Sequence, residues 1–172
     1  MNQASPRSHT IRTATPEDHS AVSRLFESSY SLLLRPCYNS PLLEAALPLM
    51  TRANPILLAS GTFFVAEDTN GVIVGCGGWT RERPGKGDVE PRLGHIRHFA
   101  THPDHSRRGI GRSIYDTCAR QARAAGISRF ECFASLNAVG FYAALGFEEI
   151  EDVDVELSDR IKLPGVLMRR SI

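Results

Sequence analysis

The stretch Ile96–Ala124, IRHFATHPDHSRRGIGRSIYDTCARQARA, decides the fold of this chain. It begins with an apolar strand and continues through a His-Pro turn and a basic loop with two glycines into a helix. Apolar residues recur along that helix at every fourth position, at Ile110, Ile114, Cys118 and Ala122. This period is typical of a helix with one buried face. We therefore predict a strand–loop–helix unit that the rest of the chain covers and completes.

The loop before this helix has the chemistry of an anion site. The first N–H groups of a helix have no internal partner, and the helix dipole makes that end positive. Gly109 and Gly111 lack a Cβ, so an anion can approach the backbone closely, and Arg107, Arg108 and Arg112 add positive charge around them. The expected ligand is a phosphate or pyrophosphate, and the alternative is a plain glycine turn with solvated arginines.

Two common phosphate-binding loops do not match this stretch. The dinucleotide fingerprint requires a third glycine at the position of Ile114. A P-loop ends in Gly-Lys-Ser/Thr, and no such string occurs in the chain.

Two motifs resemble those of the GNAT superfamily of N-acetyltransferases. Thr101-His102-Pro103 followed by Arg108-Gly109-Ile110-Gly111 is similar to the acetyl-CoA-binding motif, Gln/Arg-x-x-Gly-x-Gly/Ala after a Val/Thr-x-Pro turn, although Ser106 stands where the motif has Gln or Arg. The stretch Asn137–Phe147, NAVGFYAALGF, resembles the family signature Asn…Phe-Tyr-x-x-Leu-Gly-Phe. The motifs occur in the family's order, and the resemblance covers roughly residues 10–172.

The resemblance implies a mixed α/β fold. We expect a mostly antiparallel twisted sheet of about six to seven strands with helices on both faces and a splayed central strand pair. Periodicity and turn signals predict strands near residues 10–14, 62–67, 72–76, 96–101, 127–134, 147–157 and 163–169. Helices are expected after Pro16, after Pro41, over 110–124 and briefly after Asn137. We expect one domain over residues 1–172, with 1–9 loose.

Composition excludes several classes of protein. The chain has 172 residues, 42% hydrophobic and 23% charged, which suits one globular core. A net charge of +1 gives no global attraction to nucleic acid or membranes. No apolar run approaches the ~20 residues that span a bilayer, and the start has no signal-peptide core. The cysteines, which lack CxxC spacing, favour a reduced, cytoplasmic protein; they are Cys37, Cys76, Cys118 and Cys132.

The resemblance also implies acetyl-CoA as the cosubstrate. The backbone of Phe99, Ala100 and Thr101, on the splayed strand, would hold the pantetheine arm and polarise the thioester carbonyl. Ser135 stands seven residues before Tyr142, where many members carry a pantetheine-binding Asn, and Asn137 stands only five before it. Either is a candidate, and Asn137 has the alternative of capping a short helix. The pyrophosphate would be held by Ser106, Arg107, Arg108, Gly109, Ile110, Gly111, Arg112 and Ser113.

Tyr142 matches the family tyrosine that reaches the CoA sulfur, and we expect it to act as the general acid. A phenol has a pKa of about 10, so it keeps its proton at neutral pH. The alternative is that Tyr142 only packs the short helix onto the sheet.

His95 is the candidate general base, since it stands where several members carry a strand Glu. His98 is the rival, and a spacing of three puts the two on opposite faces of a strand unless a bulge intervenes. Glu82, Asp88, Glu90 and water chains are further possibilities.

Tyr30 and Trp79 are the candidate substrate-binding residues, with simple packing as the alternative for both. The histidines at 95, 98, 102 and 105 suggest a metal site. They cross a strand and a proline turn and cannot share one helical face, so we expect no metal.

The expected activity is transfer of acetyl from acetyl-CoA to a primary amine by direct attack in a ternary complex. Cys132, on a neighbouring strand, leaves a covalent route open. The alternative from another class is a non-catalytic CoA-binding or CoA-sensing module. The expected partner is a small-molecule or peptide amine, with no nucleic acid and no membrane, and a homodimer is possible.

Overall fold

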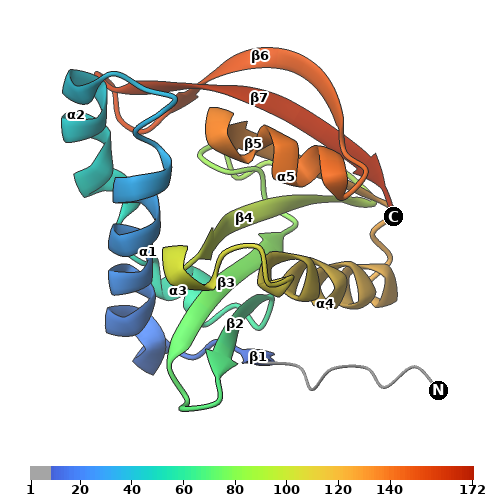
Figure 1. The fold of residues 1–172 in the computed structure, drawn as a ribbon. Helices are drawn as coiled ribbons and strands as arrows, with labels where there is room; N and C mark the ends of the chain where they lie inside the picture. The colour runs from blue at the N-terminus through green and yellow to red at the C-terminus, as the bar shows by residue number, and fades with distance from the viewer. Residues whose placement is uncertain (1–8) are drawn as a thin grey trace.

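One seven-stranded sheet forms the centre of the molecule (Figure 1). The structure is a computed structural model and describes residues 9–172. The strand order is β1-β2-β3-β4-β5-β7-β6, and every neighbouring pair is antiparallel except β4–β5, which is parallel. The strands are β1 (His9–Thr13), β2 (Phe63–Asp68), β3 (Ile73–Thr80), β4 (Leu93–Thr101), β5 (Arg129–Ser135), β6 (Glu148–Glu156) and β7 (Lys162–Ser171).

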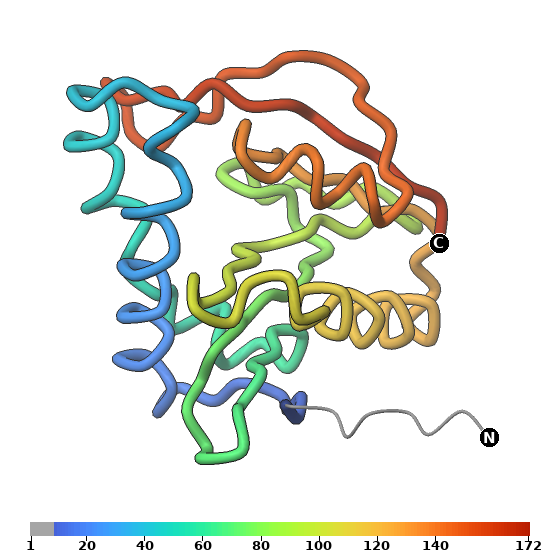
Figure 2. Tube along the Cα trace, in the orientation of Figure 1, coloured from blue at the N-terminus to red at the C-terminus, as the bar shows by residue number. Residues whose placement is uncertain are grey.

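Helices cover both faces of the sheet. The α4 helix packs over β1–β4 on one face, while α1 packs against β3 and β4 on the other. Figure 2 shows α1 and α2 together at one side of the molecule, with the C-terminus on the opposite side. The helices are α1 (His19–Leu33), α2 (Ser40–Met50), α3 (Pro55–Leu58), α4 (Ile110–Ala124) and α5 (Val139–Ala144), and the 3-10 turns are η1 (Pro16–Asp18), η2 (Pro103–His105) and η3 (Leu136–Ala138).

The predicted apolar stripe of α4 is the face that meets the sheet. Ile110, Ile114, Cys118 and Ala122 are each at most 2% exposed. Burial of such side chains stabilises the fold by roughly 1.5–3 kcal/mol for each large one. The predicted mixed α/β fold with helices on both faces is therefore confirmed.

Several features differ from the sequence prediction. His9, which the sequence analysis includes in a loose segment, begins β1, and the expectation for residues 1–8 lies outside the described residues. The third strand was expected over 72–76, but β3 continues through Gly77 and Gly78 to Thr80. Those glycines admit close neighbours: a Cβ on Gly77 would lie 2.5 Å from the Phe99 ring. The short helix α3 was not predicted, because four residues show no period; its only sequence signals are the Asn54 cap and Pro55 at its first position.

The central parallel pair separates along its length. Only Leu93–His95 of β4 pairs with Arg129–Glu131 of β5, although β4 continues to Thr101 and β5 to Ser135. The predicted splayed strand pair is confirmed. In its second half, each strand has a backbone edge that no neighbouring strand covers.

A bulge lies in β4 at the start of this separation. Arg97 pairs with Gly78 and Ala100 with Cys76, so three steps on β4 match two on β3. His98 lies in the bulge with a left-handed backbone, φ 49°. Its ring packs near Phe26 of α1, with centroids 5.8 Å apart.

In the part of the chain that the structure describes, no helix is long and apolar enough to cross a membrane.

Candidate active site

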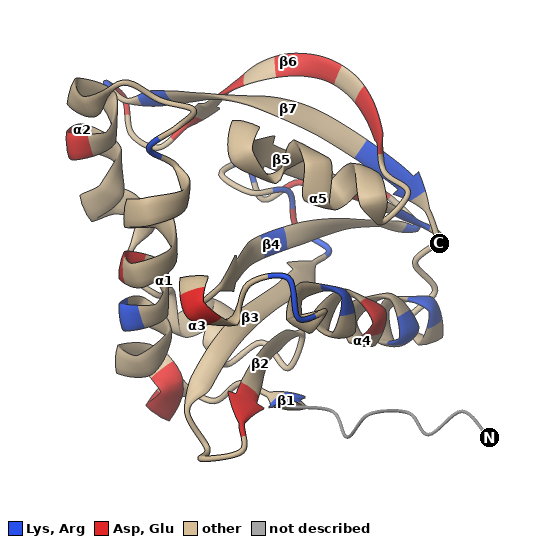
Figure 3. Ribbon diagram, in the orientation of Figure 1, with Lys and Arg blue, Asp and Glu red and all other residues tan. Residues whose placement is uncertain are grey.

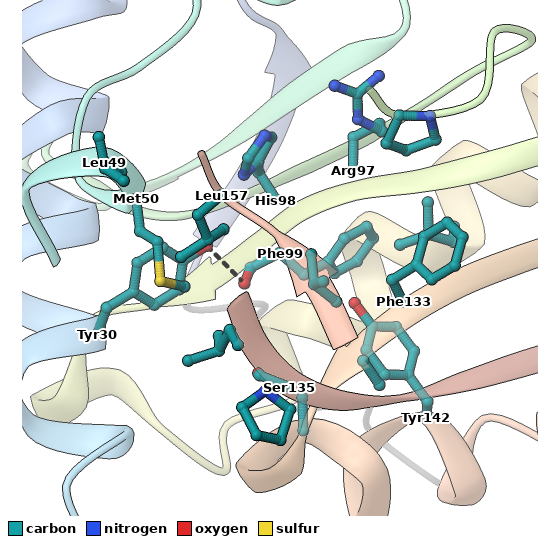
Figure 4. Close-up of a pocket in the computed structure, with 17 residues that line it drawn as sticks. Tyr30, Leu49, Met50, Arg97, His98, Phe99, Phe133, Ser135, Tyr142 and Leu157 are labelled. Atoms are coloured by element: carbon teal, nitrogen blue, oxygen red, sulfur yellow. Dashed lines mark hydrogen bonds between the residues drawn. The ribbon is translucent and has the colours of Figure 1, made fainter. Parts of the chain in front are cut away.

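A cleft of about 220 Å³ lies where β4 and β5 separate (Figure 4). One wall is β4, at Arg97, His98 and Phe99, and the other is β5, at Phe133 and Ser135. The end of α2, the loop before β4 and the β6–β7 hairpin close its outer side. The cleft therefore joins elements from both halves of the chain.

Tyr142 of α5 lines this cleft, and its hydroxyl points into it in Figure 4. The residue is 6% exposed. Its ring packs edge-on against the rings of Phe99, Phe141 and Phe147, with centroids 5.0–6.3 Å apart. Burial raises the pKa of Tyr142 well above its usual value, so the hydroxyl keeps its proton at neutral pH.

Tyr30 of α1 reaches the same cleft from the opposite side. It stacks on Phe26 at 5.3 Å and its hydroxyl donates to the Phe99 carbonyl over 3.4 Å, as Figure 4 shows. This contact attaches α1 to the bulged part of β4. The predicted Tyr30 is thus brought to the cleft together with Tyr142 and Phe99.

Ser135 and Asn137 form one polar contact at the end of β5. The Ser135 hydroxyl donates to the Asn137 side-chain oxygen over 2.7 Å, and Ser135 lines the cleft. Asn137 lies inside η3 and does not cap α5, which begins after Ala138 without a side-chain cap. The predicted capping role of Asn137 is wrong because η3 precedes the helix.

The glycine loop lies beside the cleft. Gly109 caps α4 with a left-handed backbone, φ 77°, and no atom lies within 4 Å of the place a Cβ would take. A Cβ on Gly111 would lie 2.8 Å from the Phe141 ring, and Phe141 packs on Phe99, 6.1 Å between centroids. The start of α4 therefore packs on Phe141, which in turn packs on Phe99 of the cleft wall.

Positive charge gathers at that helix start. Arg107, Arg108 and Arg112 are exposed, and Arg112 donates to the Ala144 carbonyl over 3.1 Å. Figure 3 shows Lys and Arg on the loop into α4, and Asp and Glu along β6. Ser106, Ile110 and Ser113 complete the predicted loop; Ile110 is buried, and Ser106 and Ser113 are half-buried. Free helix N–H groups with arginines around them can bind phosphate oxygens.

The end of β4 supplies backbone groups next to this loop. Ala100 is 7% exposed, with its side chain in the core between the sheet and α1. Thr101 pairs with Gly75 of β3 and ends the strand. At this end of β4, the backbone edge that no strand covers is the edge facing β5.

His95 lies outside the cleft. It is 2% exposed and pairs with Thr80 and Glu131 in the sheet. Its Nδ1 is 3.9 Å from a Glu131 carboxylate oxygen and has no hydrogen-bond partner among residues 9–172. Burial lowers the pKa of His95, and the Glu131 charge opposes that shift. The Glu131 carboxylate accepts two hydrogen bonds from Arg169.

His98, the rival base, does line the cleft. His98 keeps an exposed edge, yet the groups packed around its imidazole exclude enough water to lower the pKa of His98 to about 4, and Arg97 adds to that shift. The ring is therefore neutral at pH 7, and a neutral imidazole can accept a proton. Because the bulge interrupts the alternation of side chains along β4, His98 can point to the same face of the sheet as His95.

Trp79 is not brought to the cleft. It is 2% exposed, packs in the core with Phe130 at 6.2 Å, and donates from Nε1 to Gln121 of α4 over 2.9 Å. The carboxylates of Glu82, Asp88 and Glu90 are on the exposed loop before β4 and do not line the cleft either. Within residues 9–172 no group of three or more His, Cys, Asp or Glu side chains is placed to hold a metal ion.

Comparison with known proteins decides the family. The model of the acetyltransferase (GNAT) family matches residues 27–147. This chain belongs to the GNAT acetyltransferase family. A search of curated proteins found no match.

Solved GNAT structures share the fold over nearly the whole chain. A GCN5-related N-acetyltransferase from Rhodopseudomonas palustris has a TM-score of 0.78 at 22% identity, covering 99% of this chain and 100% of that one. The PaiA N-acetyltransferase from Thermoplasma acidophilum, in complex with coenzyme A, has a TM-score of 0.73 at 16% identity, covering 96% and 99%. The protein Rv2747 from Mycobacterium tuberculosis, solved with CoA, has a TM-score of 0.61 at 24% identity, covering 95% and 99%.

The sequence prediction missed several residues of this GNAT cleft. Arg97 and Phe133 line it from the two splayed strands, and Leu157 and Leu163 line it from the β6–β7 hairpin. Alternation along the strands could have placed Phe133 on one face, but nothing local shows which cavity that face meets. Arg97 precedes a bulge that no glycine or proline marks.

Proposed function

We propose that the protein transfers acetyl from acetyl-CoA to a primary amine by direct attack in a ternary complex. The observation that carries this proposal is the Tyr142 hydroxyl, which faces the cleft between the splayed strands next to the glycine loop. Similarity to N-acetyltransferases, one of them solved with coenzyme A, supports it. Its setting would be the cytoplasm, where thiols stay reduced.

The chain offers a group for each part of the cosubstrate. The pyrophosphate would lie at the N-terminus of α4, held by the N–H groups of Gly109–Ser113 and by Arg107, Arg108 and Arg112. The pantetheine arm would lie in the separation between β4 and β5, bonded to the open backbone edge at Phe99–Thr101 and to Ser135 or Asn137. The thioester then reaches Tyr142.

In the reaction the amine nitrogen forms a C–N bond to the acetyl carbon and the C–S bond breaks. The thiolate that leaves would take its proton from Tyr142. The new amide nitrogen would give up its remaining excess proton to solvent, and solvent would reprotonate Tyr142. The high pKa of the buried phenol opposes this transfer, and burial of the leaving thiolate beside it favours protonation of the sulfur.

The ammonium form of the acceptor must also lose a proton. His98 is a histidine on the cleft wall, and we propose that it accepts this proton directly or through water. His95, buried beside Glu131, would act only through intervening groups.

A covalent acetyl-cysteine route has little support. Cys132 is 3% exposed, and burial raises its pKa, so the thiol stays protonated and unreactive. This favours direct attack over a two-step transfer.

The Tyr142→Phe substitution tests the proposal. The ring keeps its packing and only the hydroxyl is lost, so we expect kcat for CoA release to fall about 10–1,000-fold while acetyl-CoA affinity changes less than about threefold. Tyr115→Phe is the matched control, because Tyr115 is 2% exposed on α4 and does not line the cleft.

An unchanged kcat in Tyr142→Phe would remove Tyr142 from its role. If acetyl-CoA binds but no amine in a broad panel causes CoA release, the protein is instead a CoA-binding module without turnover.

A further inference from the structure

The side chains that line the cleft are mostly apolar, and the charged groups among them are basic. Its outer wall is apolar, with Leu49, Met50, Leu157 and Leu163 among the lining residues. The basic side chains that line it are Arg97 and His98, and no Asp or Glu among the residues that the structure describes, 9–172, lines it. A polyamine or other dication would find no carboxylate there to replace its lost hydration.

Arg97 is held in a fixed place at this wall. Its Nη1 donates to the Thr80 hydroxyl over 3.0 Å, and that hydroxyl donates in turn to the Glu82 carbonyl over 2.9 Å. Among residues 9–172, no carboxylate lies within ion-pair distance of the Arg97 guanidinium. The group is half-buried and retains several N–H donors. Glu82 acts on its charge from a distance but forms no ion pair with it, and a partly buried cation without an ion-pair partner is costly.

We propose that the acceptor is a small apolar amino acid, whose carboxylate binds Arg97 and whose side chain packs against Leu49, Met50, Leu157 and Leu163. The inference rests on the proposed acetyl transfer and names its substrate class. A guanidinium pairs with a carboxylate through two parallel hydrogen bonds, which also fixes the orientation of the amine.

The dimensions suit such a ligand. Arg97 stands two residues before Phe99, about 6.6 Å along a strand, and the bulge shortens that distance. The amine and carboxylate of an amino acid are separated by one carbon, so an acceptor bound to Arg97 through its carboxylate would have its amine inside the cleft that Tyr142 and Phe99 also line. The volume of about 220 Å³, which the acetyl thioester would share with the acceptor, is below the roughly 300–1,000 Å³ of pockets for drug-sized ligands.

The test compares each acid with its own amide. CoA release is measured with L-leucine, L-methionine and L-phenylalanine, with the three corresponding amides, and with spermidine. For at least one pair, the wild-type kcat/KM is expected to favour the acid at least tenfold. In Arg97→Gln that ratio is expected to fall at least tenfold, mainly through KM for the acid. The acid-to-amide ratio of kcat/KM in the variant is divided by the same ratio in the wild type. This division cancels the difference in intrinsic reactivity between the two amines.

Arg24→Gln is the matched control, since Arg24 is an exposed residue of α1 that does not line the cleft and loses the same charge. It is expected to keep the wild-type ratio. Thermal melting of both variants shows whether the fold is intact.

A binding measurement distinguishes failure of the proposed carboxylate site from failure of the proposed acetyl transfer. N-acetyl-L-leucine, N-acetyl-L-methionine and N-acetyl-L-phenylalanine are titrated by calorimetry into the CoA-loaded protein. Binding of one that weakens at least tenfold in Arg97→Gln supports the carboxylate site even if turnover is absent, in which case only the proposed transfer fails. Turnover that favours the amides or spermidine, or an Arg97→Gln effect equal on acid and amide, overturns the inference and leaves the transfer standing.

Discussion

His98 combines an unusual backbone with an unusual ionisation. Its left-handed φ of 49° lies in a bulge, a conformation that costs a non-glycine residue about 1–3 kcal/mol unless the surroundings hold it. The bulge turns the ring toward Phe26 and the cleft. The sequence identifies His98 as a candidate base but does not predict where its ring points, because regular alternation along a strand puts residues 95 and 98 on opposite faces.

We predict that His98 makes stability depend on pH. An unfolded histidine has a pKa near ~6.5, and the native pKa is about 4. Between these values the unfolded chain holds a proton that the native protein lacks, so the free energy of unfolding rises with pH. This contribution is present above about pH 6.5 and is lost as pH falls through 4.

Urea unfolding at pH 4.5 and 6.5 measures the effect. His98→Asn keeps a residue that tolerates the left-handed region and removes the titration, so its gain in stability over this interval is expected to be smaller than that of the wild type. His95, whose pKa is also lowered, supplies part of the remaining gain. Equal gains in both proteins would contradict the lowered pKa of His98.

At the scale of elements, the cleft depends on close packing between β3 and β4. Gly77 of β3 lies under the Phe99 ring, and Gly75 lies under Ile110 at the start of α4, where a Cβ would be 2.5 Å from each neighbour. These glycines let the sheet approach both the cleft wall and the phosphate loop. Glycines within a strand favour close approach by another group, but the sequence does not show which residues make that approach.

The Gly77→Ala substitution tests this packing. The added Cβ would be 2.5–2.7 Å from three Phe99 ring atoms, so the ring must shift. We expect a loss of about 1–3 kcal/mol in stability and a raised KM for acetyl-CoA, measured by urea unfolding and steady-state kinetics.

Gly140→Ala is the control for this change. Gly140 lies in α5 with no atom within 4 Å of its missing Cβ, so alanine is expected to be neutral or stabilising by up to about 1 kcal/mol. If both variants behave alike, the contact between Gly77 and Phe99 does not support the cleft wall.

Over the whole molecule, the site arises where two strands part. β5 pairs with β7 from Arg129 to Ser135, but with β4 only at its first three positions. The backbone edges left open on β4 and β5 are groups that a ligand can bond, much as an added strand does. Local periodicity predicted each of these strands. The separation itself came only from the family resemblance, because no local pattern encodes how far two distant strands stay paired.

The cleft lining could be predicted only in part for the same reason. The two family motifs located the glycine loop and Tyr142, which are continuous in sequence. Arg97, Phe133 and the β6–β7 residues meet only in the folded chain, and Trp79, a large aromatic beside glycines, packs into the core instead.

The central claim is that the loop at the start of α4 and the open strand edges bind acetyl-CoA. Calorimetric titration of the purified protein with acetyl-CoA tests it most directly, repeated with the Gly109→Val/Gly111→Val double variant and with Gly140→Ala as control. Both glycine sites restrict a side chain, Gly109 by its left-handed φ of 77° and Gly111 by the Phe141 ring at 2.8 Å. We predict one-to-one binding by the wild type and by Gly140→Ala, weakened at least tenfold in the double variant. Absence of binding by the wild type, or equal affinity in a folded double variant, would contradict the account.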